Sequence, residues 1–268
     1  MTAMDDSTPR VRPVTAEESE AFYENGWVKL PGLISRVAAA HLLRRARARF
    51  GEDGRSGLEP KTAMDRGWFR SQMSPDDEAF LALAKSEELG HNAARLFGRD
   101  SAIRMMLHSL SAKLPSDSER GKATDFHQDT AQHMFFEGNS LNVWVALDEV
   151  TPEMGALQFY TGSHRCGNMG NLMDPTVRRG WDARLAKSCQ LTPPITLQPG
   201  DATVHTHLMI HGTGPNLSTR VRWSWIGMFL PADVRYTGAS SYYTDGLGLK
   251  PFGPIDHPKF PVIYQPAA

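Results

Sequence analysis

The feature that most restricts the fold of this chain is a change of pattern after Gly98. Beyond it, short apolar or alternating segments are separated by Gly, Pro, Asn and Asp, which is typical of strands in a β-sandwich or barrel. A β-rich core is therefore expected in the second part of the chain. We expect its strands at Met105–Leu114, Leu141–Leu147, Ala156–Tyr160, Ile195–Leu197, Ala202–His205 and Val221–Leu230.

The residues before Gly98 predict helices instead. Thr15 and Glu18 have the spacing of a capping box, which marks the start of a helix, and Ser35 can cap a second one. In the second helix, we expect an apolar face of Val37, Ala40, Leu43 and Phe50. The helices are expected over 16–25, 36–50, 76–85 and 87–96, with a short strand over 27–30.

Helices followed by short strands predict one α+β domain with a mainly β core, in which the helices pack on one sheet. We expect a single domain over 1–268, made of a mainly helical part (1–98), the β core (99–230) and a C-terminal tail (231–268). A further helix is expected at Pro175–Ser188, between strands. Five prolines from Pro251 onward predict an extended tail rather than a helix.

Charge and cysteine content exclude several classes of protein. Lys and Arg together number 29 and Asp and Glu 30, so the net charge of −1 lacks the basic footprint of a nucleic-acid-binding protein. No apolar run is long enough for a membrane helix, and the segment Met1–Pro13 does not resemble a secretory signal. Cys166 and Cys189 are too few for a disulfide framework. We expect a cytoplasmic protein whose partner is a small molecule, not a nucleic acid or a membrane.

Histidines are concentrated in the β-rich part. Of the 10 histidines, seven lie between His108 and His211. Imidazole is the most common nitrogen ligand of metal ions in proteins. The concentration is compatible with a metal site, but histidines bonded within a core would give the same pattern.

His127 and Asp129 are the most informative pair. On an extended strand, residues i and i+2 project to the same face, so one imidazole and one carboxylate can share a metal ion. A second histidine would complete the two-histidine, one-carboxylate triad of non-heme iron oxygenases. His205, His207 and His211 have the same parity, so spacing alone does not choose among them.

An arginine occurs at the start of an otherwise apolar strand. Alternation places Trp223, Trp225 and Phe229 on one face, and Arg222, Ser224, Ile226 and Met228 on the other. An unpaired buried charge is costly, so Arg222 requires either an anionic ligand or a structural partner such as Asp201. Arg220 has the same parity as Arg222 and is an alternative.

Several motifs follow one another in a familiar order. They are His127-Gln-Asp129, the segment from Trp144 to Leu157, Gly162-Ser-His-Arg165, Pro199-Gly-Asp201, His211-Gly-Thr-Gly-Pro-Asn216 and Arg222. In this order they resemble the phytanoyl-CoA dioxygenase family of Fe(II)- and 2-oxoglutarate-dependent oxygenases. The resemblance covers about Met105–Phe229, with weaker similarity at 23–32 and 257–262.

The resemblance implies a double-stranded β-helix, a cupin-like jelly roll with helices bracing one sheet. It also implies that His127, Asp129 and His211 are the iron ligands, and that Arg222 binds the distal carboxylate of 2-oxoglutarate. A guanidinium suits a carboxylate because its planar fork binds both oxygens. Other positions that match the lining of the co-substrate pocket are Gln128, Trp144, Thr213, Ser109 and Lys113.

The activity implied is hydroxylation of an unactivated C–H bond in a small organic molecule, using Fe(II), 2-oxoglutarate and O₂ and releasing succinate and CO₂. Natural-product intermediates, amino acid derivatives and acyl groups are all candidates, and His133, Phe135 and Phe136 are candidate pocket residues. Desaturation, epimerisation and ring formation use the same ligands and stay open, as does a non-catalytic cupin-like binding module. Halogenation is disfavoured because related halogenases have a small residue where Asp129 stands.

Overall fold

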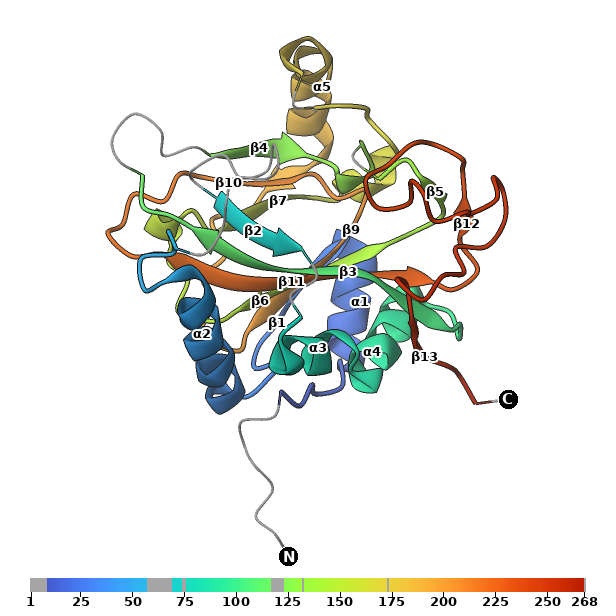
Figure 1. Cartoon of the computed structure of the whole chain (residues 1–268). Coiled ribbons are helices and arrows are strands. Elements are labelled where there is room, and N and C mark those ends of the chain that lie inside the picture. The colour runs from blue at the N-terminus through green and yellow to red at the C-terminus, as the bar shows by residue number, and fades with distance from the viewer. Residues whose placement is uncertain are drawn as a thin grey trace, which may run out of the picture.

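The fold was analysed in a computed structural model, which describes residues 9–56, 69–73, 76–116, 123–131, 133–172 and 174–267. Its centre is formed by two sheets that face each other, with the first four helices below and a fifth above (Figure 1). Every strand pairing within these residues is antiparallel. The arrangement is the expected cupin-like jelly roll, in which two sheets enclose one interior.

The larger sheet has seven strands in the order β1-β9-β6-β11-β3-β13, and β2 also pairs with β3. Neighbouring strands therefore come from distant parts of the chain. Their bounds are β1 Trp27–Leu30, β2 Phe69–Met73, β3 Ile103–Lys113, β6 Leu141–Ala146, β9 Ala202–Thr206, β11 Arg222–Pro231 and β13 Val262–Tyr264.

The smaller sheet has four strands in the order β4-β10-β7-β8, and a separate two-stranded sheet joins β5 to β12. Short 3₁₀ helices interrupt the connections. The bounds are β4 Thr124–His127, β5 Phe136–Glu137, β7 Leu157–Thr161, β8 Gln190–Leu191, β10 His211–Thr213 and β12 Arg235–Tyr236, with 3₁₀ helices η1 Asp129–Ala131, η2 Pro152–Met154 and η3 Ser163–Cys166.

Four helices cover the outer face of the larger sheet: α1 Ala16–Asn25, α2 Arg36–Phe50, α3 Glu78–Ala84 and α4 Glu87–Phe97. The capping box predicted for the first helix is confirmed, with Thr15 accepting from the Glu18 backbone and Glu18 accepting from the Thr15 backbone. Ser35, Asp77 and Ser86 cap the other three helices through their side chains. These local hydrogen bonds fix where each helix starts.

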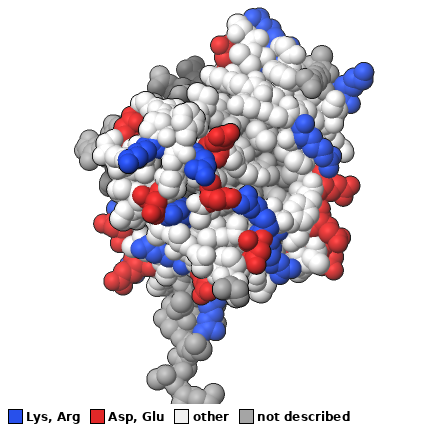
Figure 2. Space-filling model, turned by 90° about the vertical axis from the view of Figure 1, so that its right-hand side faces the viewer, with Lys and Arg blue, Asp and Glu red and all other residues white. Residues whose placement is uncertain are grey.

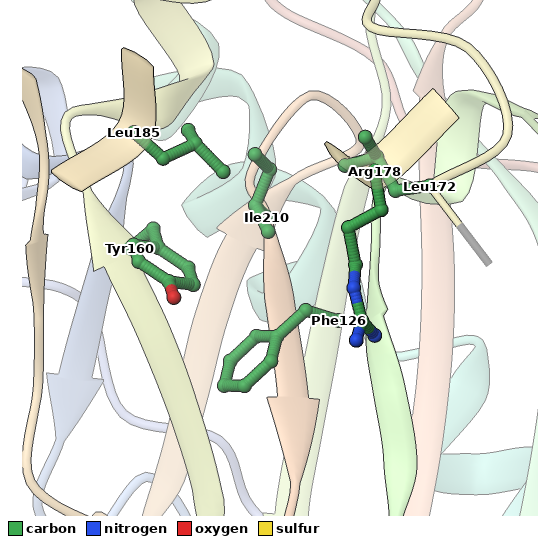
Figure 3. Close-up of a pocket in the computed structure, with 6 residues that line it drawn as sticks. All are labelled: Phe126, Tyr160, Leu172, Arg178, Leu185 and Ile210. Atoms are coloured by element: carbon green, nitrogen blue, oxygen red, sulfur yellow. The ribbon is translucent and has the colours of Figure 1, made fainter. Parts of the chain in front are cut away.

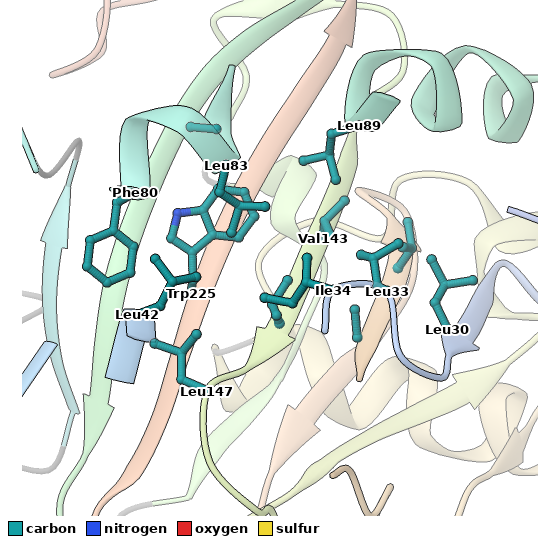
Figure 4. Close-up of a cluster of buried hydrophobic side chains, with 14 of the residues drawn as sticks. Leu30, Leu33, Ile34, Leu42, Phe80, Leu83, Leu89, Val143, Leu147 and Trp225 are labelled. Atoms are coloured by element: carbon teal, nitrogen blue, oxygen red, sulfur yellow. The ribbon is translucent and has the colours of Figure 1, made fainter. Parts of the chain in front are cut away.

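The main hydrophobic core lies between these helices and the larger sheet. Figure 4 shows Leu42, Phe80 and Leu83 of the helices around the indole of Trp225, which projects from β11. Trp223 lies on the same face of β11 and packs against Phe50, with ring centroids 5.9 Å apart. The other face of β11 points into the interior between the two sheets. The alternation predicted for this strand is therefore confirmed.

The structure corrects two expectations and adds one strand. Val37 is 49% exposed, and the buried face of α2 consists of Ala38, Ala39, Leu42, Ala46 and Phe50. Residues 195–197 form no strand, because only Leu197 makes an isolated bridge, to Val150. The strand β2 was not predicted. The helix α5 (Pro175–Ser188) matches its prediction and packs above the smaller sheet.

The C-terminal part contains no helix within its described residues, as expected, but it is anchored to the fold. β13 pairs with β3, and β12 pairs with β5. Ile255 and Phe260 are fully buried in a second cluster with residues of β3 and β11. No helix in the described part of the chain is long and apolar enough to cross a membrane.

Candidate metal and co-substrate site

Three predicted ligands meet in the interior between the two sheets. His127 ends β4 and His211 begins β10, and the two are direct partners in the antiparallel register, with ring centroids 4.4 Å apart. The sequence predicts Asp129 on the same strand as His127, but the strand ends at His127 and Asp129 begins η1. The ligand atoms of the three buried side chains all lie within 4.8 Å of one another.

The two histidines present the same nitrogen to the centre of this group. Nδ1 of His127 lies 2.8 Å from the carbonyl of Asp125, and Nδ1 of His211 lies 3.0 Å from the carbonyl of Met209. A carbonyl only accepts, so each Nδ1 carries a proton, and in the neutral form of each ring the lone pair is on Nε2. The Nε2 atoms lie 3.5 Å and 3.8 Å from the same oxygen, Oδ1 of Asp129. This arrangement is typical of metal-binding histidines.

The electrostatics of the group also suit a metal ion. Burial alone would raise the pKa of Asp129, but His211, His127 and His205 hold it well below its usual range. Burial lowers the pKa of His211 to about 3, assisted by the neighbouring His205. Asp129 is thus a carboxylate and His211 a neutral imidazole at neutral pH, the forms in which both bind metals.

The other two histidines of the same parity have different contacts. His205 lies on β9, and its Nε2 is 3.3 Å from Oδ2 of Asp129, the oxygen that faces away from His127 and His211. His207 follows the end of β9, and its Nδ1 accepts from the Ser140 backbone at 3.2 Å. Neither belongs to the group of three.

A residue that sequence reasoning missed also contacts Asp129. The side-chain amide of Asn142 donates to Oδ2, from the inner face of β6. The same alternation that places Trp144 inward applies to Asn142, two residues earlier, so the signal was present in the sequence.

Two basic side chains lie at the other end of the interior. Arg222 and Lys113 are direct partners across β11 and β3, and both are buried. Burial lowers the pKa of Arg222 to about 9, and burial together with Arg222 lowers the pKa of Lys113 to about 6. A position at which the charged forms are this unfavourable suits an anionic ligand.

The contacts of Arg222 leave part of its guanidinium available. It donates to the carbonyl of Gly155 and lies over the ring of Trp144, 5.1 Å from the centroid. Its buried Nε has no partner among the described residues. Asp201, the alternative partner considered for it, pairs instead with Lys29 at 3.3 Å.

Thr213 connects the two ends of the site. It lies two residues after His211 on β10, and its hydroxyl is 2.5 Å from Nζ of Lys113, which also donates to the carbonyl of Gly214 at 2.5 Å. Gly155 has a φ of +68° here, and a Cβ would lie 2.4 Å from the Gly214 carbonyl and 3.0 Å from Nζ of Lys113. Only glycine therefore fits beside the basic pair.

Serine hydroxyls lie on the inner face of the larger sheet, between the Lys113–Arg222 pair and Asn142. Ser109 is buried on β3, opposite Ile226. Ser111 and Ser224, which the sequence analysis did not select as site residues, face each other across β3 and β11, next to Lys113 and Arg222. Both hydroxyls are buried without a hydrogen-bond partner among the described residues, so they can contact a polar ligand.

Gln128 projects away from this site. Its amide nitrogen donates to the carbonyls of Gly167 and Leu208 at 2.8 and 2.6 Å, and its oxygen accepts from the Met169 backbone at 2.8 Å. Its side chain therefore anchors these loops behind the two metal-site residues that flank it.

An aromatic cluster borders the metal site. His133 and Phe135 pack against Tyr243 of the C-terminal segment, with ring centroids 5.8 and 5.6 Å from it, and Phe136 contacts Phe135. On the face of the molecule that includes β5 and β12, a hollow lined mainly by uncharged residues is bordered by charged side chains (Figure 2). Tyr243 was not predicted, since it lies more than 100 residues beyond the metal motif.

A separate cavity of about 180 Å³ lies under α5, on the outer face of the smaller sheet. Phe126 and Ile210 line it together with Tyr160 and Leu185 (Figure 3). Phe126 and Ile210 precede His127 and His211 in the chain, so alternation directs them to the opposite face. This cavity is therefore not part of the metal site.

Comparison with known proteins agrees with the resemblance. The model of the phytanoyl-CoA dioxygenase family matches residues 22–224. A probable alpha-ketoglutarate-dependent hypophosphite dioxygenase of Stutzerimonas stutzeri is 26% identical, covering 79% of this chain and 77% of that protein. Dioxygenase lolE1 of Epichloe uncinata is 25% identical, covering 81% and 82%.

Solved structures share the fold. The epimerase SnoN from nogalamycin biosynthesis, determined with Fe³⁺, alpha-ketoglutarate and nogalamycin RO, has a TM-score of 0.75 at 21% identity, over 92% of this chain and 97% of that one. The carbocyclase SnoK has a TM-score of 0.71 at 20% identity, over 93% and 96%. EctD from S. alaskensis, with 2-oxoglutarate and 5-hydroxyectoine, has a TM-score of 0.64 at 21% identity, over 87% and 83%.

Proposed function

Because this chain belongs to the phytanoyl-CoA dioxygenase family, we propose that it hydroxylates an unactivated C–H bond of a small organic molecule, using Fe(II), 2-oxoglutarate and O₂. One observation carries the proposal. The inner surface of the two sheets has a two-histidine, one-carboxylate group at one level and a buried arginine–lysine pair at another, joined through Thr213. The first group suits a metal ion, and the second suits a carboxylate of a dicarboxylate ligand.

His127, Asp129 and His211 are the residues that would hold the iron. Two neutral imidazole nitrogens and one carboxylate oxygen on one side of an ion are the donor set of the non-heme Fe(II) oxygenases. When bound, the iron supplies the oxygen chemistry that the side chains lack, with 2-oxoglutarate oxidised to succinate and CO₂. The carbonyls of Asp125 and Met209 keep both histidines in the tautomer that this ligation needs.

The co-substrate would lie between the metal site and the basic pair. Arg222 would bind the distal carboxylate of 2-oxoglutarate, and Lys113 would add positive charge beside it. Trp144 holds the plane of the guanidinium, and Thr213 positions the Lys113 ammonium. Ser109, Ser111 and Ser224 offer hydroxyls along the same face. Gln128 would contribute indirectly, through the loops that its amide holds.

The substrate would enter beside the aromatic cluster of His133, Phe135 and Tyr243. The mostly uncharged hollow on this face favours a molecule with an apolar body (Figure 2). We further propose that residues 1–268 form one catalytic domain that acts in the cytoplasm on a small molecule, without a nucleic-acid or membrane partner, in keeping with the net charge of −1.

Epimerisation or ring formation is the second candidate outcome. The solved structures of similar fold include an epimerase and a carbocyclase, both of which depend on alpha-ketoglutarate. Product mass separates the outcomes, because hydroxylation adds one oxygen atom, epimerisation leaves the mass unchanged, and ring closure or desaturation removes two hydrogen atoms.

The experiment that tests the proposal has two stages. Fe(II) and 2-oxoglutarate are first added without oxygen, and a weak visible charge-transfer band is expected. Oxygen is then admitted with a pool of small metabolites, and succinate and product masses are followed with and without a chelator. Equal succinate formation in both arms would contradict an iron-dependent reaction, and a stable complex without turnover would favour a binding module.

A further inference from the structure

The two oxygens of Asp129 have different neighbours. Oδ1 faces Nε2 of His127 and of His211, at 3.5 and 3.8 Å. Oδ2 is approached by two other groups, the amide nitrogen of Asn142 and Nε2 of His205, the latter at 3.3 Å. One oxygen thus belongs to the metal group, and the other is engaged by residues outside it.

Asn142 and His205 reach Asp129 from the opposite sheet. They are direct cross-strand partners on β6 and β9 of the larger sheet, and both are buried. His127 and His211 lie on the smaller sheet. The contacts to Oδ2 therefore span the interior, and the position of the carboxylate depends on both sheets.

The chemistry of the two groups makes both of them donors. The nitrogen of an amide only donates, and a carboxylate only accepts. For His205 to bind Oδ2, its Nε2 must carry the proton, which leaves the lone pair on Nδ1. Nδ1 of His205 is buried and has no partner among the described residues. His205 therefore presents a proton rather than a lone pair to the site, and it cannot act as a fourth ligand in this state.

We propose that Asn142 and His205 are positioning residues that hold Oδ2 of Asp129 and restrict this carboxylate to binding the metal through Oδ1. The inference rests on the proposed metal site. A carboxylate with both oxygens free can chelate an ion and occupy a coordination position that the co-substrate or oxygen needs. Two hydrogen bonds to Oδ2 oppose chelation, and they also stabilise the ionised form.

Substitutions of His205 by two amides of different length test the idea. Gln can place its amide nitrogen near the position of Nε2, whereas the shorter Asn cannot reach Oδ2. We expect His205→Gln to bind Mn(II), a redox-stable probe for Fe(II), within about threefold of the unmodified chain, and His205→Asn to bind it about 10- to 100-fold more weakly. Isothermal titration of the metal-free protein measures both affinities.

Two further variants separate positioning from general packing. Asn142→Leu keeps the number and branching of the side-chain heavy atoms but has no donor, and it should weaken Mn(II) binding by a similar factor. His207→Asn is the matched control, because His207 is equally buried and close in sequence but does not contact Asp129. It should lower the melting temperature without changing Mn(II) affinity. Circular dichroism of each metal-free variant confirms that it is folded.

The anaerobic Fe(II)–2-oxoglutarate band provides a second readout that packing alone does not change. We expect His205→Asn to shift or lose this band, and His205→Gln to keep it. Equal metal affinities and equal bands in these two variants would overturn the inference. If the unmodified chain itself shows neither Mn(II) binding nor the band, the proposed function fails instead, so the two failures are distinguishable.

Discussion

Lys113 and Arg222 are direct cross-strand partners at the start of β11, and both side chains are buried on the inner face of the larger sheet. The pKa of Lys113 is lowered to about 6 by burial and by this neighbouring guanidinium. Both side chains can be charged at the same time only when an anion lies between or beside them. The pair therefore makes the binding of a dianionic co-substrate sensitive to protonation.

Binding of 2-oxoglutarate should take up a proton above about pH 6. In the ligand-free protein Lys113 is mostly neutral there, and the bound carboxylate favours its charged form, so its pKa rises on binding. The sign follows from linkage: affinity is greatest near or below the ligand-free pKa and weakens as pH rises above it. Titration calorimetry at about pH 7.5 in two buffers of different ionisation enthalpy measures the uptake.

The control for proton uptake is Lys113→Met, which keeps an apolar stem of similar length but has no titrating group. It should bind 2-oxoglutarate with no more than a small buffer dependence. If the unmodified chain and Lys113→Met show the same buffer dependence, the proton is taken up elsewhere.

Arg222→Ala should weaken 2-oxoglutarate binding strongly and leave metal affinity almost unchanged. Loss of one partner of a sheltered charge pair costs about 2–5 kcal/mol, which corresponds to a factor of about 30 to more than 1,000. Arg222→Lys should restore only part of the affinity, because an ammonium lacks the bidentate fork. The KM for 2-oxoglutarate and its dissociation constant report the change.

Arg220→Ala is the matched control for Arg222. The side chain of Arg220 is 51% exposed and pairs with Asp148 and Glu149, at 3.1 and 3.4 Å. Its removal should change the KM for 2-oxoglutarate by less than about threefold, since exposed ion pairs contribute little. A large increase in the KM for 2-oxoglutarate in Arg220→Ala, with a small increase in Arg222→Ala, would mean that Arg220 binds the co-substrate instead.

Much of the fold could be predicted because local signals agreed with the tertiary structure. Thr15 and Glu18 fixed the first helix, and the alternation in β11 separated Trp223 and Trp225 from Arg222 correctly. The prediction for the buried face of α2 was right for Phe50 but wrong for Val37 and Ala40. The arginines and alanines of this helix give a weak periodicity, and packing on the sheet selected Ala38 and Ala39.

The site was less accessible to sequence reasoning because its contacts are long-range. Alternation along a strand does not distinguish His205, His207 and His211 as ligands. His211 lies opposite His127 because β10 pairs with β4. Asn142 acquires its contact with Asp129 by facing across the interior from another sheet. Gln128 has the same sequence context as its neighbours, but its side chain points to the opposite side.

Phe50→Ala should destabilise the fold without changing the metal site. The ring is fully buried between α2 and Trp223, far along the outer face of the larger sheet. Truncation of a buried phenylalanine costs about 3–5 kcal/mol in the free energy of unfolding, which urea denaturation can measure. Val37→Ala, on the exposed side of the same helix, should cost less than about 1 kcal/mol. Similar losses in both variants would contradict the packing of α2.

Cys189 should react slowly with alkylating reagents in the folded protein. Burial, together with the neighbouring Cys166, raises the pKa of its thiol to about 11, so little thiolate is present at about pH 8. Iodoacetamide, followed by peptide mass analysis, should modify Cys189 about 10- to 100-fold more slowly than free glutathione. In denaturant the difference should disappear. Fast labelling of Cys189 in the folded chain would contradict the raised pKa of its thiol.

Removal of any single proposed ligand should abolish tight metal binding while the chain stays folded. His127, Asp129 and His211 meet at one point, so each alanine variant leaves two donors, too few to hold an ion against water. We expect His127→Ala, Asp129→Ala and His211→Ala to weaken Mn(II) binding by more than about 100-fold, a larger loss than for residues that contact the ligands without binding the metal.

His207→Ala should bind Mn(II) as the unmodified chain does, since its ring contacts the Ser140 backbone. Mn(II) also stabilises a folded protein that binds it, so the rise in melting temperature on adding the metal should vanish in the three ligand variants and persist in His207→Ala. A folded His207→Ala variant without metal binding, beside a His211→Ala variant that retains it, would reverse the assignment of the second histidine.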